Sequence, residues 1–491
     1  MSAMLLNALG SLAHPEVLLA ILSGTLGGIV IGAIPGLTAT MAVALLIPVT
    51  FGMDPVVGLA MMGGVYSGGM YGGAISSILL STPGTPAAAA TAFDGYPMTR
   101  QGRGGTAIAV ATVASFWGGI ISTAALLLLA PILAHFALRF GPPEYFLLAV
   151  MGLASIVTLT SGNLLKGLIS GVLGLVIATV GMDPIDGYIR FTGGIVDLFE
   201  GVSFMPALIG LFSVSQILEL TADSHIVQEL ADPVGLSTSR LPKGLGGTIV
   251  RGGFIGTVVG ILPGAGATIA SFISYNFAKQ ISREPQTFGT GNPQGVAAAE
   301  SANNGCVGGS LVPLLTLGIP GNSVAAALMG GLMIQGLIPG PELFTRFGTV
   351  TYGFILSLFL ANVCFLILGL SFARFFAKVA TVPNSVLIPS IAVLSVVGSY
   401  AISNSMFDVW LMIAFGLGGY FLHRAGFSLG AVVLGLILGP VAELGFGQSL
   451  IISHGSPAIF FTRPICLVLW GLIILLLVPA LRRKGLSPET S

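Results

Sequence analysis

One break in a long apolar run, the Ser-Thr-Pro-Gly-Thr-Pro hexapeptide at Ser81–Pro86, most constrains what this chain can fold into. Proline removes a backbone donor and glycine accepts unusual dihedral angles, so the segment cannot continue as a helix. The chain around it is 54% hydrophobic and 7% charged, whereas soluble domains carry about 25% charged residues. We therefore expect a polytopic helical membrane protein. In a bilayer, broken backbone persists only where it is buried in protein or lines a wet cavity.

Three further breaks of the same kind occur, at Gly318–Ser323, Ile34–Thr38 and Leu262–Gly266. A helix that starts after a break presents free N–H groups and the positive end of its dipole, which attract carboxylates. Carbonyl groups at the end of the preceding segment suit a hard cation such as sodium. We predict substrate contacts from Thr82, Gly84, Thr85, Gly321, Asn322 and Ser323, and cation contacts from Pro35, Thr38, Ser81, Gly264 and Gly318. The alternative is that the breaks are kinks whose hydroxyl groups cap their own helices.

A polar cluster precedes each of the two longer breaks. Counting back from the two prolines, Ser67 in the first half aligns with Asn304 in the second, and Asn303 adjoins it. Adjacent amides offer both donors and acceptors, so we predict that these three residues also bind substrate, with helix capping as the alternative. Glu300 is the single acid beside the cluster. Its two interpretations are a cation or proton ligand and an interfacial residue.

The two halves of the chain look like repeats. Pro35 and Pro263, Pro83 and Pro320, and Arg103 and Arg346 are related in order, at separations of 228, 237 and 243 residues. The slow drift in spacing indicates an old duplication.

Charges in the connecting loops are swapped between the halves. Cytoplasmic loops are enriched in Lys and Arg, which places Arg100 and Arg283 inside and Asp54 and Glu342 outside. The fold class predicted is therefore an all-α polytopic membrane protein with two inverted repeats, discontinuous or re-entrant helices and about 11–14 membrane segments. Its regions are a first repeat at 1–221, a polar linker at 222–244, a second repeat at 245–481 and a basic, then polar, cytoplasmic tail at 482–491.

Several functions find no support in the residues. The formal net charge is zero, so no nucleic-acid partner is expected. The cysteines are far apart and His14, His135, His423 and His454 are isolated, so no transition-metal site is expected. No nucleophile–base pattern and no phosphate loop is visible, so the chain is not expected to be an enzyme. An intramembrane enzyme using Glu300 and a non-transporting scaffold are the alternatives.

Long motifs resemble the large membrane subunit of the tripartite tricarboxylate transporters, the TctA-like family. They lie at Gly32–Met41, Tyr71–Ser76, Thr82–Pro97, Phe288–Gly291, Glu300–Asn304 and Leu314–Gly321. The resemblance implies a permease of the bacterial inner membrane that works with a periplasmic solute-binding protein and a small membrane subunit. It implies uptake of a di- or tricarboxylate driven by an ion gradient, through sodium or proton symport. An elevator-type motion follows only by analogy with other carboxylate transporters. Whether the subunit dimerises is left open.

Overall fold

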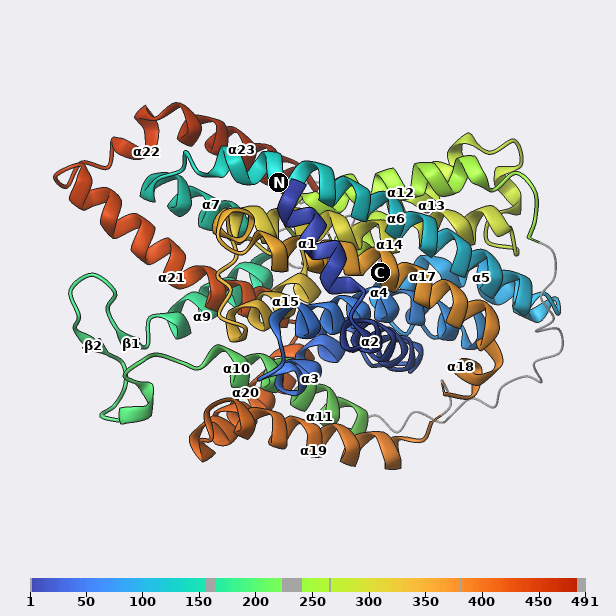
Figure 1. Ribbon diagram of the computed structural model, residues 1–491, viewed down its shortest axis with the longest axis horizontal. Helices are drawn as coiled ribbons and strands as arrows, with labels where there is room; N and C mark the ends of the chain where they lie inside the picture. Colours follow the sequence, from blue (N-terminus) through green and yellow to red (C-terminus); the bar gives the residue numbers. More distant parts are fainter. Residues whose placement is uncertain (1, 155–163, 223–240, 265, 380–381, 484–491) are drawn as a thin grey trace, which may run out of the picture.

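The computed structural model describes residues 2–154, 164–222, 241–264, 266–379 and 382–483. Within them the chain is almost entirely helical (Figure 1). The first half contains α1 (Ser2–Leu12), α2 (Pro15–Ala33), α3 (Ala39–Thr50), α4 (Pro55–Leu80), the 3-10 turn η1 (Pro86–Ala88), α5 (Ala89–Arg100), α6 (Gly104–Ala137), α7 (Pro142–Ala154), α9 (Leu164–Ala178), strands β1 (Gly181–Met182) and β2 (Ile189–Arg190), η2 (Val196–Leu198), α10 (Phe204–Ile209), the π-turn η3 (Gly210–Val214) and α11 (Ser215–Ala222).

The second half repeats the same kinds of element. It contains α12 (Gly246–Ile261), α13 (Gly266–Ile281), η4 (Pro285–Thr287), α14 (Pro293–Leu317), α15 (Ser323–Ile334), α16 (Glu342–Thr345), α17 (Gly348–Ser371), α18 (Ala373–Val379), α19 (Asn384–Ser403), α20 (Met406–Arg424), α21 (Leu429–Ile452), α22 (Ile459–Thr462) and α23 (Pro464–Arg483). Seven helices in the described part are long and apolar enough to cross a membrane. The polytopic membrane class is thereby confirmed. Most of the predicted linker and tail lies outside the described residues.

Each half begins with a pair of helices that forms a hairpin against a long central helix. In the first half, Gly24, Gly28 and Gly32 of α2 lie in turn against Met61, Val65 and Gly69 of α4. The two backbones touch, because a Cβ atom at Gly28 would lie 2.5 Å from the carbonyl oxygen of Val65. Helix α3 then returns along α4. The pair α2–α3 is therefore a hairpin whose tip is the first break.

The second half is built in the same way. Gly252, Gly256 and Gly260 of α12 lie in turn against Ala298, Ala302 and Cys306 of α14. The hydroxyl of Ser274 on α13 donates to the carbonyl oxygen of Ala298, at 2.7 Å, so α13 returns along α14 as α3 does along α4. At 12 residues, α3 spans about 18 Å, which is too short to cross a bilayer. Helix α3 is therefore one arm of a hairpin and not a separate membrane span.

The two central helices, α4 and α14, run antiparallel where they cross. The side-chain amide of Asn304 donates to the Ser67 carbonyl oxygen and that of Asn303 to the Met70 carbonyl oxygen. Further along, the hydroxyl groups of Ser310 and Tyr66 lie 2.8 Å apart. Later residues of α14 thus contact earlier residues of α4. The first arm of each hairpin, α2 or α12, runs parallel to its own central helix. The α2–α3 and α12–α13 hairpins consequently enter the protein from opposite directions.

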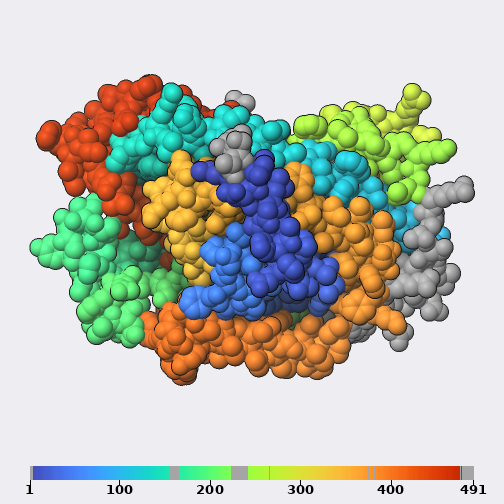
Figure 2. Space-filling model, in the orientation of Figure 1, coloured from blue at the N-terminus to red at the C-terminus, as the bar shows by residue number. Residues whose placement is uncertain are grey.

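The long helices exchange partners between the halves. Helix α6 packs against α14, and α17 packs against α4. Likewise α3 packs beside α15, whereas α13 packs beside η1 and α5. Each half thus completes its core with elements of the other half. In Figure 2, α1 and α2 lie over the centre of one face, with α19 and α20 along one edge.

A buried carboxylate joins the two halves near the ends of α5 and α14. One oxygen of Asp94 accepts hydrogen bonds from the backbone N–H groups of Gly289, Gly291 and Asn292, at 2.8–2.9 Å. The hydroxyl of Tyr275 donates to its other oxygen at 2.9 Å. Asp94 is fully buried. This bonding fastens α5, which follows the second break, to the loop that leads into α14.

Candidate functional site

The first and third breaks are tight hairpin tips at which a new helix begins. Gly36 and Gly264 have φ values of +87° and +79°, in the region that favours glycine. Thr38 is the N-cap of α3, and its hydroxyl accepts a hydrogen bond from the Met41 N–H at 3.2 Å. Helix α13 begins at Gly266. Both tips therefore present a helix N-terminus to the interior of the protein.

The second and fourth breaks are return loops rather than kinks between two coaxial helix halves. Helix α4 ends at Ser81 and α14 ends at Gly318, and both residues adopt the left-handed conformation. The chain then doubles back. The Gly84 N–H donates to the carbonyl oxygen of Gly73, which lies about two helical turns before the end of α4. Helix α5 therefore starts in the centre of the protein, beside α4, as does α15 beside the opposite hairpin.

The four breaks meet at one cavity of about 590 Å³. Among the residues that line it are Thr38 of the first break, Thr85 of the second, Gly266 of the third, and Asn322 and Ser323 of the fourth. The hydroxyl groups of Thr40 and Ser323 lie 3.0 Å apart and join α3 to α15 at its edge. Segments more than 280 residues apart in the sequence thus form one wall.

Helices that begin at the cavity wall contribute positive potential to it. Helices α3, α13 and α15, and the η1–α5 segment, all start at its wall, and α21 starts at the opposite side after its N-cap Ser428. Each N-terminus carries about half a positive charge in unsatisfied N–H groups. The titratable side chains among the lining residues are Glu219 and His423, whose Oε1 and Nδ1 atoms lie 3.1 Å apart. Such a surface favours an anion.

The corner between α20 and α21 is a part of the site that the sequence did not reveal. The ammonium group of Lys166 on α9 donates to the carbonyl oxygen of Ala425 at 2.7 Å. The hydroxyl of Ser170 accepts from the Ser428 N–H at 3.0 Å. These two bonds hold the corner against α9, with Gly426–Gly430 facing the cavity. Ser428 directly before the apolar run from Leu429 was the available signal, since serine is a common N-cap.

Several residues predicted to bind substrate or cation do not lie among those that line this cavity. Ser81 and Thr82 are exposed at the far end of α4. Gly318 lines a second cavity instead. The glycines Gly84 and Gly321 pack their backbones against α2 and α12, because a Cβ atom at either would meet a carbonyl oxygen within 3 Å. Pro35 and Gly264 shape the two hairpin tips.

The cluster of Ser67, Asn303, Asn304 and Glu300 lies behind the cavity, at the α4–α14 crossing. All four side chains are buried. Glu300 accepts hydrogen bonds from Thr91 at 2.5 Å, from Ser115 at 3.0 Å and from Asn303 at 3.4 Å. Glu300 is fully buried within the protein.

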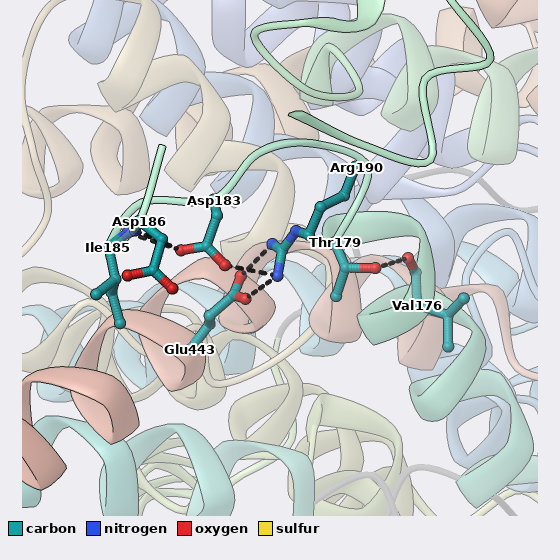
Figure 3. Close-up of polar contacts among 7 residues, drawn as sticks. All are labelled: Val176, Thr179, Asp183, Ile185, Asp186, Arg190 and Glu443. Carbon is teal, nitrogen blue, oxygen red and sulfur yellow. Dashed lines mark hydrogen bonds and ion pairs between the residues drawn. The ribbon is translucent and has the colours of Figure 1, made fainter. Parts of the chain in front are cut away.

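The second cavity, also of about 590 Å³, lies on the other side of the fourth break. It is lined by Leu317–Ile319 and by the acids Glu200, Glu342 and Glu443. Beside it, the Arg190 guanidinium forms two hydrogen bonds with Glu443, at 2.7 and 3.1 Å, and an ion pair with Asp183 at 2.8 Å (Figure 3). These contacts attach the β1–β2 hairpin to α21.

The charge on Asp183 is stabilised locally. The backbone N–H groups of Ile185 and Asp186 donate to its carboxylate, and together with the Arg190 guanidinium they hold its pKa below the ordinary value. The acidic lining makes this second cavity a poor site for an anion. The first cavity is therefore the better candidate for the binding of a carboxylate.

The fold and the first cavity together are typical of polytopic membrane transporters, in which broken helices surround a central cavity. Comparison with known proteins supports this class. The model of the tripartite tricarboxylate transporter TctA family matches residues 18–434. The chain belongs to this family, which is a transporter family and not an enzyme family.

Two relatives come from Agrobacterium vitis. An uncharacterized 52.8 kDa protein in the TAR-I ttuC′ 3′ region is 39% identical over 468 residues, which cover 94% of this chain and 93% of the relative. An uncharacterized protein in the TAR-II ttuC′ 3′ region is 40% identical over 233 residues, which cover 47% of this chain and 96% of the relative. No solved structure matches the chain. The chain is thus a membrane subunit of a tripartite tricarboxylate transporter.

Proposed function

We propose that this subunit imports a di- or tricarboxylate, or a related organic anion, by cation symport through alternating access. One observation carries the proposal: helix N-termini from both halves converge on one central cavity. The dipoles and free N–H groups of these helices provide positive potential without a lysine or arginine in the lining. The shape suits a flexible anion with several oxygens.

The arrangement of the halves supports alternating access. The α2–α3 and α12–α13 hairpins enter from opposite directions beside antiparallel central helices. Two inverted repeats of this kind place a midplane site between two exchangeable routes. We propose that the first repeat has Asp54 outside and the second has Arg283 inside, with the tail after Arg482 in the cytoplasm. An elevator-type movement of the hairpin regions against α9, α20 and α21 is part of this proposal.

A periplasmic solute-binding protein that delivers the anion and a small membrane subunit would complete the transporter in the bacterial inner membrane. Membership of the tripartite family supports both partners. The binding protein would select the cargo before the permease receives it.

Uptake by the complete three-component system in membrane vesicles tests the proposal. The probe is radiolabelled citrate, with succinate, tartrate and an aromatic dicarboxylate as competitors, and with sodium and proton gradients imposed separately. We expect accumulation that requires the binding protein and one of the two gradients. Accumulation indifferent to both gradients would refute the symport, and transport of no carboxylate would refute the cargo class.

A further inference from the structure

Three buried oxygens at the α4–α14 crossing have no hydrogen-bond partner: the Ser67 hydroxyl and the side-chain carbonyl oxygens of Asn303 and Asn304. Each of these residues is at most 1% exposed. The orientation of both amides follows from their neighbours. The Asn303 nitrogen lies between the Met70 carbonyl oxygen and Glu300, and the Asn304 nitrogen faces the Ser67 carbonyl oxygen. Because each nitrogen must face these acceptors, the amide oxygens are left without donors.

Unpaired buried acceptors are costly. Leaving one unsatisfied costs about 1–3 kcal/mol, and most buried polar groups in proteins do find a partner. The three orphaned atoms are all oxygens from neutral side chains. A carboxylate substrate cannot satisfy amide oxygens, since both would be acceptors. A hard cation can, because carbonyl and hydroxyl oxygens are the ligands that such ions prefer.

The charge at the α4–α14 crossing also favours a cation. Glu300 is fully buried, one helical turn from Asn303 and Asn304 on α14. Its hydrogen-bond partners Thr91, Ser115 and Asn303 are neutral, and it forms no ion pair among the described residues. An acid within the membrane normally has a partner of opposite charge. One carboxylate among neutral oxygens matches a monovalent cation, whereas divalent ions usually take more carboxylates.

The crossing adjoins the central cavity through α4. Met70, whose carbonyl oxygen binds Asn303, lines that cavity, and so does Thr85. The Thr85 hydroxyl is likewise buried without a partner, beside Gly73 one turn further along α4. Buried oxygens without a hydrogen-bond partner thus lie on or beside α4 from the cavity wall to the crossing. The crossing therefore lies about one helical turn of α4 from the cavity wall, because Ser67 is three residues before Met70.

We propose that Ser67, Asn303 and Asn304 bind a monovalent cation, sodium in the first instance, whose charge Glu300 balances. The proposal rests on the cation symport proposed above and names the groups that hold the ion. It reassigns these three residues, which the sequence associated with the carboxylate, to the coupling ion. The anion is left to the helix N-termini of the cavity.

Sodium binding is measured on the purified full-length chain in nanodiscs, without cargo or partners. The thermal midpoint is followed as sodium chloride replaces choline chloride at constant ionic strength. We expect sodium to raise the midpoint, with potassium less effective. Asn303→Leu and Asn304→Leu, which keep the side-chain volume, should raise the half-maximal sodium concentration by about 10–100-fold. The matched control is Asn362→Leu on α17, since Asn362 is also buried with an unpaired side-chain oxygen but lies against Gly119 of α6.

Each outcome is decisive. A sodium response that the crossing variants lose and N362L retains supports the site. No sodium-specific response in the unaltered chain, or a response that the crossing variants retain, overturns it. If the leucine variants do not fold, Ser67→Ala is the smaller change, and an unaltered half-maximal concentration in S67A overturns the site. Vesicle uptake separates the two proposals: sodium-driven uptake with an unaffected response in S67A rejects this site but keeps the symport.

Discussion

The second and fourth breaks occupy related positions in the two halves, yet their capping residues are bonded differently. Asn322 of the fourth break accepts from the Ala325 N–H at 2.8 Å and donates to the Tyr66 hydroxyl at 2.8 Å. Thr85 of the second break is buried, and its hydroxyl has no partner. The fourth break is held by side-chain hydrogen bonds within the protein, whereas the second break has a hydroxyl without a hydrogen-bond partner at the cavity wall.

This difference separates two roles that look alike in the sequence. Asn322 uses both ends of its amide to hold α15 against α4, so it positions the fourth break. Thr85 stabilises nothing by a side-chain hydrogen bond and is the better candidate for a direct ligand contact.

The largest effect is expected for Asn322→Ala. The change removes the N-cap of α15, which costs about 0.5–2 kcal/mol, and leaves the Tyr66 hydroxyl with Ser310 alone. We expect a lower thermal midpoint together with at least a roughly tenfold loss of uptake. Asn322→Asp, which keeps the cap, should restore the midpoint. A normal midpoint in N322A would contradict the positioning role.

Thr85→Val should separate binding from stability. Valine has nearly the same shape, and the hydroxyl it replaces has no partner, so the midpoint should be unchanged or slightly raised. Carboxylate uptake should show a higher KM, by about 3–10-fold, the value of one lost hydrogen bond. Thr85→Ser serves as the control that keeps the hydroxyl. If T85V transports normally, the contrast between the two breaks is structural only.

A smaller effect on uptake is expected for Tyr66→Phe. The phenol hydroxyl bonds to both Asn322 and Ser310, and its removal leaves one donor of Asn322 unpaired. We expect a loss of about 1–3 kcal/mol in unfolding free energy, measured by thermal or denaturant unfolding. Uptake should fall less than in N322A because the cap of α15 persists. An equal loss of uptake in Y66F and N322A would show that the effect of N322A comes entirely from the lost contact with Tyr66.

The substitutions Glu219→Gln and His423→Gln test whether these two side chains add to the effect of the helix N-termini on anion binding. Both residues are partly exposed, at 29% and 53%, and an exposed ion pair contributes about 0–1 kcal/mol. We expect little change in thermal midpoint and a change in KM of no more than about fivefold. A complete loss of uptake in H423Q would show that the anion depends on a side-chain cation, contrary to the comparison of the breaks.

The smallest effect is expected at the β1–β2 hairpin, whose Met182 lines the second cavity and not the first. Because the folded-state pKa of Asp183 is lowered, its contribution is present above the ordinary carboxylate pKa and is lost as the pH falls through the lowered value. A fluorophore at Tyr188→Cys should report more hairpin mobility at pH 3 than at pH 6. Asp183→Asn should abolish the difference. Uptake near neutral pH should be unaffected.

The four breaks could be predicted from the sequence because each pairs proline with glycine, a dipeptide that marks turns, and the Asn pair before the fourth because adjacent amides stand out in an apolar run. The return of the chain at Gly84 could not, since a broken helix and a return loop have the same local composition. The α20–α21 corner was missed because its place in the site depends on contacts with Lys166 and Ser170, more than 250 residues away. The bonding of Thr85 and Asn322 likewise depends on which helix lies opposite each.

The short helices α3 and α15 have an electrical consequence. Each has 12 residues and so extends about 18 Å, against a hydrocarbon thickness of about 30 Å. A cation that reaches the central cavity would have crossed only part of the membrane voltage. Moving one charge through the full voltage is worth about 2.3 kcal/mol per 100 mV, so ion binding would draw on a fraction of this energy. The membrane potential would then act on ion occupancy as well as on the movement of the loaded protein.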